Sequence, residues 1–446
     1  MELLEILTIQ NSWWKTGQVR QENLGSFYRE LFSHILAKLN KKEILSIIGP
    51  RRSGKTILIH QLIQHLLDQK TAPQRIVYLS LDNLSILKPS LIDQIVQSMA
   101  ELLNEPVDEF KKPVFIFLDE VHKLAKWANQ VKHWQDLNLN IKFIISGSSA
   151  MQVIKGAGES LLGRIDHHTL FPLSFKEFLN VKHQIKMQNI DIFDFRQLKK
   201  QYAQFLPYQA KIQLALKDYL KRGGYPALLN EKIEEVFKIL LEYKDLSLQR
   251  DIFDLEEIRD TKTLNELVLV LASLATERLS YNKLGTILLA RVNTIKRYLG
   301  LLEDIYLIKE AVVYKKPYTA LKYEKKVYLV DPGMINALTM NYELKEEAKL
   351  IENIVAMHIY RLNLKQEINP RQYYWLNDGE VDVIGKNKDK VIPIEVKYRE
   401  NPEILKSIKE FMHKFNAPQG IIVSKNMFQQ KKDIFIVPAW LFLASV

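Results

Sequence analysis

The chain has 446 residues, 47% hydrophobic and 26% charged, a composition typical of a globular protein with about two to four domains. It contains no cysteine, which excludes disulfides, thiolate zinc sites and cysteine nucleophiles. Its net charge of +11 suits nucleic-acid binding but also a lysine-rich solvated surface, so the location of the charge must decide. No apolar run approaches the ~18 residues of a transmembrane helix, and no basic signal region opens the chain, so we expect a cytoplasmic protein with no membrane partner.

The first 40 residues are predicted to be helical, because apolar residues recur at helical spacing from Phe27 to Leu39. From residue 41 onward, short apolar runs alternate with amphipathic segments. The expected strands are 44–48, 75–81, 114–118 and 142–146, and the expected helices are 55–69, 91–103 and 121–135. This alternation predicts an α/β fold with a mostly parallel sheet covered on both faces.

Residues 49–56, GPRRSGKT, fit the phosphate-loop pattern G-x-x-x-x-G-K-[ST] and lie between a predicted strand and a predicted helix. The glycines let backbone N–H groups surround phosphates, Lys55 can reach the β- and γ-phosphates, and the Thr56 hydroxyl can bind Mg²⁺. A plain strand–turn–helix is the alternative. The residues expected to bind ATP are Gly49, Pro50, Arg51, Arg52, Ser53, Gly54, Lys55, Thr56 and Ile57.

A second apolar strand delivers Asp119 and Glu120 at its carboxyl end, where open α/β sheets bind ligands. Asp119 is expected to hold Mg²⁺ through a water, and Glu120 to polarise the attacking water as general base. A carboxylate pair that caps the next helix is the alternative.

Two further candidates follow later strands of the core. Ser146 or Ser148 could orient the attacking water, although a bare turn explains the same residues. Arg164 could act as an arginine finger on the γ-phosphate of a neighbouring subunit. An exposed or ion-paired arginine is the alternative.

The order of motifs along the chain resembles a family of prokaryotic AAA-type ATPases. The segments are GPRRSGKT, FIFLDEVHKL, IISGSSA, GRIDHHTLFPLSFKEFL, GGYPALL, LQRDI, YLGLLEDIYLI, VYLVDPG and IPIEVK. The resemblance implies an AAA-type ATPase that forms a homo-oligomer, expected to be a hexameric ring. The expected parts are an N-terminal helical segment (1–40), a P-loop ATPase core (41–175), a helical lid (176–258), a winged helix (259–336) and a restriction-endonuclease-like domain (337–446).

Residues 280–303 are predicted to form two helices joined by a turn at 290–292, with Asn293 capping the second helix. A strand pair at 305–314 and 326–330 would form the wing, joined by a basic aromatic loop that we take to run from Lys315 to Lys326. Such a helix and wing suit a DNA backbone, although winged helices can also serve only to pack domains together. The expected DNA contacts are Arg291, Asn293, Lys296, Arg297, Lys315, Lys316 and Lys322.

Asp382, Glu395 and Lys397 lie on strands predicted at 380–384 and 391–396, with 385–390 as the loop. Asp382 and Glu395, with the carbonyl of Val396, could bind Mg²⁺, and Lys397 could position a metal-activated water. The pattern resembles the D…ExK signature of restriction-endonuclease-like enzymes, with a spacing similar to that of Holliday junction resolvases. Glu352, on the apolar face of a helix predicted at 345–361, matches the helix glutamate of such nucleases and completes a catalytic quartet.

We therefore expect a DNA-acting ATPase that couples ATP hydrolysis to binding, remodelling or translocation of duplex or branched DNA. Mg²⁺-dependent cleavage is an additional activity that the quartet would allow, and a nuclease gated by ATP is a variant of this hypothesis. A degenerate nuclease fold kept for DNA binding or assembly would have much the same sequence. The alternative function is a nucleotide-dependent assembly switch whose C-terminal domains dock other proteins. Burial of the wing and of Glu352, Asp382 and Glu395 against the chain's own domains would favour that alternative.

Overall fold

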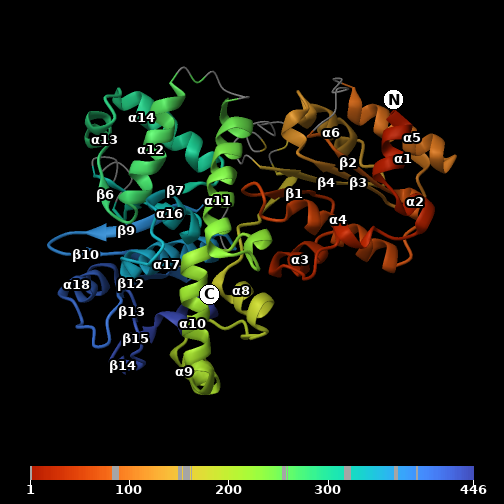
Figure 1. Cartoon of the computed structure of the whole chain (residues 1–446). Helices are drawn as coiled ribbons and strands as arrows, with labels where there is room; N and C mark the ends of the chain where they lie inside the picture. Colours follow the sequence, from red (N-terminus) through yellow and green to blue (C-terminus); the bar gives the residue numbers. More distant parts are fainter. Residues whose placement is uncertain are drawn as a thin grey trace. The chain divides into compact units, whose positions relative to one another are not determined.

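The computed structural model describes residues 3–82, 90–148, 153, 161, 163–253, 258, 260–315, 323–365, 370–387 and 390–446. The chain divides into two compact units, Met1–Phe171 (unit 1) and Pro172–Val446 (unit 2) (Figure 1). In these described parts, no helix has the length and apolar character needed to cross a membrane.

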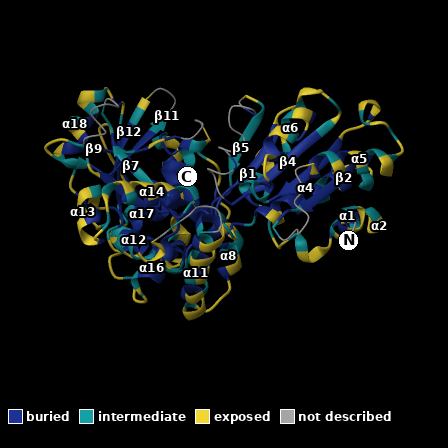
Figure 2. Ribbon diagram, turned by 90° about the horizontal axis from the view of Figure 1, so that it is seen from above, coloured by how far each residue is buried: buried dark blue, intermediate teal, exposed yellow. Residues whose placement is uncertain are grey.

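Unit 1 is built on a parallel five-stranded sheet with the order β2-β3-β4-β1-β5. The strands are β1 (Ile44–Ile48), β2 (Ile76–Ser80), β3 (Val114–Asp119), β4 (Ile141–Gly147) and β5 (Ile165–Thr169). The α-helices are α1 (Leu3–Gln10), α2 (Trp13–Thr16), α3 (Glu30–Leu36), α4 (Lys55–Asp68), α5 (Leu91–Leu103) and α6 (Trp127–Asp136). β1 and β3 are buried along their whole length, as their continuous apolar runs predict for central parallel strands (Figure 2). The predicted α/β core is thus confirmed.

The N-terminal helices belong to the core of unit 1. Trp13, Ile35 and Leu39 are buried in one cluster with residues of β1 and α4. Asn11 exchanges two hydrogen bonds with the backbone of Tyr78 in β2, at 2.8 and 2.6 Å. Residues 11–14 therefore stabilise the edge strand β2, whereas Ile35 and Leu39 pack in the interior of unit 1.

Two details of unit 1 differ from the sequence prediction. The helix predicted at 121–135 begins only at Trp127, because Glu120 and Lys126 adopt left-handed backbone conformations with φ of 57° and 56°. A 3₁₀ turn, Val121–Lys123, lies between them. β5 was not predicted, and it is an edge strand whose residues are all half-buried.

Unit 2 contains helices at its start, two sheets, and further helices between the strands. The α-helices are α8 (Phe175–His183), α9 (Phe195–Phe205), α10 (Gln209–Arg222), α11 (Ile233–Leu248), α12 (Thr261–Ser273), α13 (Tyr281–Ile287), α14 (Val292–Asp304), α16 (Pro332–Thr339), α17 (Glu347–Leu364), α18 (Lys406–Phe415) and α19 (Ala439–Ser445). The strands are β6 (Arg278–Leu279), β7 (Ile308–Val313), β8 (Lys325–Leu329), β9 (Gln372–Leu376), β10 (Glu380–Val381), β11 (Val383–Asn387), β12 (Lys390–Lys397), β13 (Gly420–Ser424), β14 (Gln429–Lys431) and β15 (Ile434–Pro438).

The two sheets of unit 2 have the orders β10-β9-β7-β8-β6 and β11-β12-β13-β15-β14. β7 and β8, the strand pair of the predicted wing, are antiparallel to each other. β7 also pairs in parallel with β9, from the segment predicted to be endonuclease-like. One sheet therefore joins the two segments that the sequence prediction treats as separate domains.

Three predictions of local structure in unit 2 are wrong. Arg291, not Asn293, occupies the N-cap position of α14, and no side chain caps that end. The predicted loop 385–390 is mostly strand, because β11 continues to Asn387 and β12 starts at Lys390. Lys325 and Lys326 lie inside β8 and are buried, so they are not part of an exposed loop.

Candidate functional site

The phosphate loop in unit 1 connects β1 to α4, as its sequence predicts. Gly49 has a φ of 148°, and a Cβ atom there would lie 2.2 Å from the carbonyl oxygen of Leu170, so only glycine fits. Gly54, with a φ of 99°, is the N-cap of α4 and has no side chain to cover the helix terminus. The N-terminus of α4 therefore points its N–H groups along the loop, as an anion-binding helix end requires.

Lys55 folds back onto the loop that precedes it. Its Nζ donates hydrogen bonds to the carbonyl oxygens of Gly49 at 2.9 Å and Pro50 at 3.1 Å. The nearest carboxylate oxygen, Oε1 of Glu120, is 4.0 Å away. The buried ammonium is thus held mainly by neutral acceptors, which an anionic phosphate can displace.

Arg29, which the sequence interpretation missed, connects the phosphate loop to the end of unit 1 through hydrogen bonds. Its guanidinium is buried and donates to the carbonyl oxygens of Ser53 at 3.0 Å and Phe171 at 2.8 Å. An arginine in a polar N-terminal segment carries no local signal of this role, because its acceptors are backbone groups distant in sequence.

Asp119 gathers three hydroxyl groups at the carboxyl end of β3. Thr56 Oγ1 donates to Asp119 Oδ2 at 2.7 Å, Tyr78 OH donates to the same oxygen at 3.1 Å, and Ser146 Oγ donates to Oδ1. Burial, together with the Asp119 charge, raises the pKa of Tyr78 well above its ordinary value, so the phenol remains a donor. The structure therefore brings the two predicted Mg²⁺ ligands, Thr56 and Asp119, into direct contact. Tyr78 was missed, because a tyrosine in a buried strand looks like a core residue.

Glu120 is held by backbone and side-chain groups at the start of the turn after β3. Its Oε2 accepts from the Ser148 N–H at 3.1 Å and lies 3.4 Å from Nδ1 of the buried His122. Burial would raise the pKa of Glu120, but the positive charges of Lys55, His122 and Arg51 outweigh it and keep the pKa below its usual range. The carboxylate is therefore ionised, as a general base must be.

Ser146 contacts both carboxylate residues, and these residues do not cap the helix that follows them. Ser146 Oγ is bonded to Asp119 and also accepts from the Glu120 N–H at 3.2 Å, so it positions the carboxylates. α6 begins at Trp127, so neither Asp119 nor Glu120 caps it.

Arg164 lies just before β5, whose first residue pairs with Ile44 at the amino end of β1. Because the two strands are parallel and the phosphate loop follows the other end of β1, Arg164 is at the edge of the sheet opposite its own phosphate loop. Its Nε forms an ion pair with Asp136 at 2.8 Å, and both side chains are about two-fifths exposed, at 41% and 43%. A finger role toward another subunit stays a prediction.

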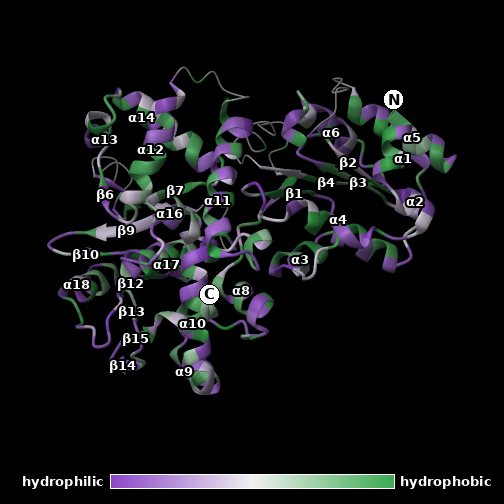
Figure 3. Cartoon of the chain, in the orientation of Figure 1, coloured by the Kyte–Doolittle hydropathy of each residue, from purple (hydrophilic) through white to green (hydrophobic). Residues whose placement is uncertain are grey.

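In unit 2, α14 has both hydrophobic and hydrophilic residues (Figure 3). Ile295, Leu299 and Leu302 are buried, as predicted for the apolar stripe. The exposed residues of this helix and of its N-cap include the predicted DNA contacts Arg291, Asn293, Lys296 and Arg297.

The predicted wing is described only in part. Lys315 is half-buried and donates to the hydroxyl of Tyr323 at 2.6 Å. Lys316 and Lys322 lie outside the described residues. Lys325 and Lys326, which the sequence interpretation placed at the end of this basic loop, are buried in β8.

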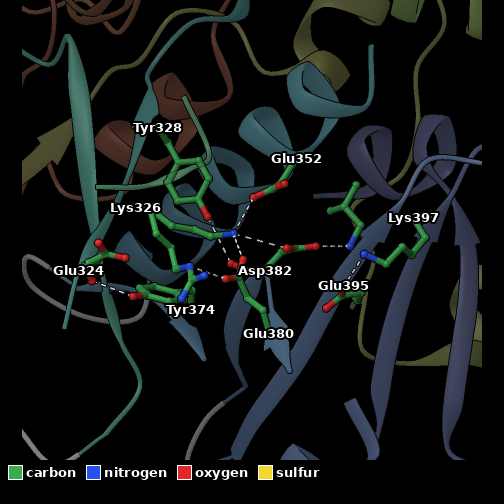
Figure 4. Close-up of polar contacts among 11 residues, drawn as sticks. Glu324, Lys326, Tyr328, Glu352, Tyr374, Glu380, Asp382, Glu395 and Lys397 are labelled. Atoms are coloured by element: carbon green, nitrogen blue, oxygen red, sulfur yellow. Dashed lines mark hydrogen bonds and ion pairs between the residues drawn. The ribbon is translucent and has the colours of Figure 1, made fainter. Parts of the chain in front are cut away.

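Lys326 lies at the centre of the carboxylate cluster instead (Figure 4). Its Nζ is 2.5 Å from Glu380 Oε1, 3.0 Å from Glu352 Oε1 and 3.5 Å from Asp382 Oδ1. Its side chain is only 3% exposed. Burial alone would lower the pKa of Lys326, but the surrounding acidic groups outweigh it and raise the pKa well above its ordinary value. The acidic groups therefore stabilise the positive charge of this buried lysine.

Two members of the predicted quartet, Glu352 and Asp382, contact this lysine, and the quartet does not form a cluster of metal ligands. Asp382 Oδ2 accepts from the Val396 N–H at 2.8 Å, and Glu395 Oε1 pairs with Lys397 at 2.8 Å. Burial and the nearby Asp382 charge raise the pKa of Glu352 to about 8 and that of Glu395 to about 7. Within the described residues, no group of three or more histidine, aspartate or glutamate side chains is arranged to hold a metal ion. Glu380 and Lys326 are members of the cluster that the sequence interpretation missed.

Family models match three parts of the chain. An AAA domain matches residues 41–179, and two domains of unknown function, DUF8612 and DUF4143, match residues 213–345 and 347–442. Together with the parallel sheet and the phosphate loop, the first match establishes an AAA-type P-loop ATPase domain, which implies nucleotide binding.

Two relatives are similar to nearly the whole chain. An uncharacterized protein of Haemophilus influenzae is 26% identical over 434 residues, which cover 93% of this chain and 98% of the relative. An uncharacterized protein of Methanocaldococcus jannaschii is 25% identical over 415 residues, covering 89% of this chain and 84% of the relative. Among solved structures, a Walker-type ATPase of Pyrococcus abyssi matches 72% of this chain and 98% of its own, with 14% identity and a TM-score of 0.43.

Proposed function

We propose that unit 1 binds ATP with Mg²⁺ at the phosphate loop and hydrolyses it, with Glu120 as general base. The observation that carries the proposal is the 2.7 Å contact between Thr56 and Asp119, because these groups must share one Mg²⁺ in such a site. Hydroxyl and carboxylate oxygens are the ligands that Mg²⁺ prefers, so the residues present fit the ion.

Each residue of the site has one task in this mechanism. The loop N–H groups bind the phosphates, and Lys55 exchanges the carbonyl oxygens of Gly49 and Pro50 for phosphate oxygens. Mg²⁺, when bound, neutralises charge on the phosphates. Glu120, held by the Ser148 N–H, orients and polarises the attacking water.

We also propose that the chain forms a homo-oligomer in which hydrolysis is completed between subunits. Arg164 would leave Asp136 and reach the γ-phosphate of a neighbour. The exposed Arg164–Asp136 pair supports this role, because an exposed ion pair contributes little stability and is easily exchanged.

The proposed partner of unit 2 is DNA, bound through the exposed basic face of α14. Arg291, Lys296 and Arg297 lie on or beside one helix whose opposite face is buried, so they can meet a backbone of phosphates together. The net charge of +11 supports the same class of partner.

A second candidate, the nucleotide-dependent assembly switch, is favoured by one observation. Glu352 and Asp382 contact Lys326 of the same unit, and Glu395 is buried beside them, so the quartet is occupied by internal contacts. Such a closed centre suits a structural or docking role of the C-terminal segment.

One experiment tests the proposal and separates the two candidates. Phosphate release is measured with no DNA, with duplex, single-stranded and four-way-junction DNA, at two salt concentrations. Lys55→Ala should reduce ATP hydrolysis by at least about 100-fold, while the matched exposed variant Lys70→Ala should not. Equal hydrolysis by the Lys55 variant and the wild type would refute the ATPase proposal.

The DNA arm uses charge reversal on α14. Lys296→Glu with Arg297→Glu should weaken DNA binding and flatten its salt dependence, whereas Lys199→Glu with Lys200→Glu, exposed on α9, should have a much smaller effect. If neither hydrolysis nor binding responds to any DNA, the assembly switch becomes the better account.

A further inference from the structure

We infer that Lys326 is a built-in cation that fills the cation position of the carboxylate centre, and that this centre accepts a divalent metal ion only when the lysine is removed from it. The lysine comes from β8, and it reaches Glu352 of α17, Glu380 of β10 in the same sheet, and Asp382 between β10 and β11 (Figure 4). The inference concerns unit 2 alone and does not depend on the ATPase proposal.

The geometry around the ammonium supports this inference. Carboxylate oxygens of Glu352, Glu380 and Asp382 converge on one nitrogen from three positions in the chain. Carboxylates converging from different elements are the ligand set of hard divalent ions such as Mg²⁺ and Mn²⁺. Here a single ammonium group lies at the point where these oxygens converge, in the place that a metal ion would take.

The balance of charge explains why the centre is stable without a metal ion. Buried carboxylates are costly unless a positive charge compensates them. Lys326 offsets one negative charge, Arg278 forms an ion pair with Glu380, and Lys397 forms one with Glu395. These three cations reduce the negative charge that a divalent ion would otherwise neutralise.

A second observation indicates unused ligand capacity beside the lysine. Glu395 is 2% exposed, and its Oε2 atom has no hydrogen-bond partner among the described residues. The N–H of the next residue, Val396, donates to Asp382 Oδ2 at 2.8 Å, which places Glu395 beside Asp382. If Lys326 is removed, Glu352, Glu380 and Asp382 lose the cation that they share, and Glu395 is a further oxygen donor near Asp382.

The position of Lys326 links the centre to the helix pair α13 and α14. In the antiparallel pairing of β6 with β8, the backbone of Lys326 lies opposite Arg278 of β6, the two-residue strand directly before α13. The side chain of Arg278 also reaches the centre, because its Nε lies 3.3 Å from Glu380 Oε2. The pairing of β6 with β8 therefore connects the carboxylate centre to the strand that precedes α13.

The test is Mn²⁺ titration of the full-length chain without nucleotide, followed by electron paramagnetic resonance. Lys326→Met should bind Mn²⁺ at least about tenfold more tightly than the wild type, a change of 1.4 kcal/mol. The gain should disappear in Lys326→Met with Asp382→Asn, which separates this centre from the Asp119 site. Lys325→Met is the matched control, because Lys325 is also buried in β8 but forms no ion pair with these carboxylates among the described residues.

A second variant and readout cover the case in which Lys326→Met does not fold. Lys326→Gln keeps a hydrogen-bond donor, and Mn²⁺ should raise its thermal midpoint more than that of the wild type. The inference is overturned if both Lys326 variants respond to Mn²⁺ like the wild type. It is also overturned if the wild type already binds Mn²⁺ through Asp382 as tightly as the variants do.

Discussion

Each unit contains a buried lysine near carboxylates, and the two lysines are held in opposite ways. In unit 1, Lys55 donates to two backbone carbonyls, and the nearest carboxylate is 4.0 Å away. In unit 2, Lys326 contacts carboxylates at 2.5 and 3.0 Å. An arriving phosphate can replace the neutral acceptors of Lys55, whereas Lys326 is already neutralised by the protein.

The pKa values of the buried glutamates in the two sites are shifted in opposite directions. Burial raises the pKa of any carboxyl group, but at Glu120 the charges of Lys55, His122 and Arg51 reverse the shift. At Glu352 the nearby Asp382 reinforces burial, and the pKa rises to about 8. A buried glutamate thus has a lowered pKa in unit 1 and a raised pKa in unit 2, because its charged neighbours differ.

The largest expected effect is the loss of ATP hydrolysis when the proposed general base, Glu120, is replaced by a neutral side chain. Glu120→Gln should slow ATP hydrolysis by about 10²–10⁴-fold, because the amide cannot accept the proton of the attacking water. ATP binding should persist, since the phosphate loop is untouched. Single-turnover hydrolysis and equilibrium ATP binding measure the two effects, and Glu22→Gln, exposed in the same unit, is the control. Loss of binding together with hydrolysis would contradict the role given to Glu120.

The next effect is the pH dependence of stability in unit 2. The folded pKa values of Glu352 and Glu395, about 8 and about 7, lie above the ordinary value of about 4.3 for an unfolded glutamate. The folded state therefore binds more protons, and the stability that these groups add below about pH 4.3 is lost as the pH rises through 7 to 8.

Urea unfolding between pH 5 and pH 8 measures this loss. Glu352→Gln should reduce the loss by at least about 1 kcal/mol, whereas Glu403→Gln, exposed in the same unit, should leave it unchanged. An unfolding free energy that is constant over this range in the wild type would show that the cluster carries no excess protons.

The smallest effect concerns the hydroxyl that supports Asp119. Tyr78→Phe removes one hydrogen bond to Asp119, at 3.1 Å, and should cost about 0.5–1.5 kcal/mol. The Mg²⁺ concentration that gives half-maximal hydrolysis should therefore rise by a few-fold to about tenfold. Titration of Mg²⁺ at saturating ATP measures it, with Tyr28→Phe, exposed in unit 1, as the control. An unchanged Mg²⁺ dependence would leave Thr56 and Ser146 as the only supports that matter.

The sequence predicts the ATP site well because its groups follow one another at fixed offsets from buried strands. Lys55 and Asp119 are each placed by the strand or loop next to them, and parallel strands bring their carboxyl ends together. Tyr78 and Arg29 escape detection because their partners lie on other elements.

The C-terminal centre is predicted only in part, for a physical reason. Asp382, Glu395 and Glu352 were found because carboxylates on apolar faces need partners. Lys326, the partner of Glu352, was expected in an exposed loop, because two consecutive lysines are typical of a solvated segment. Pairing of β8 with β6 and β7 buries Lys326, and those pairings depend on segments far apart in the sequence. β5, with the polar sequence IDHHT, was missed for the same reason.

The sheet β10-β9-β7-β8-β6 also limits how this protein can be rearranged by recombination. The two family models of unknown function meet between residues 345 and 347, but hydrogen bonds between β7 and β9 cross that junction, and so do the contacts of Lys326 with Glu352 and Asp382. A C-terminal segment exchanged at this junction would carry buried acids without their lysine. The two segments should therefore be inherited together, and a hybrid would need a lysine at the matching position of its new β8.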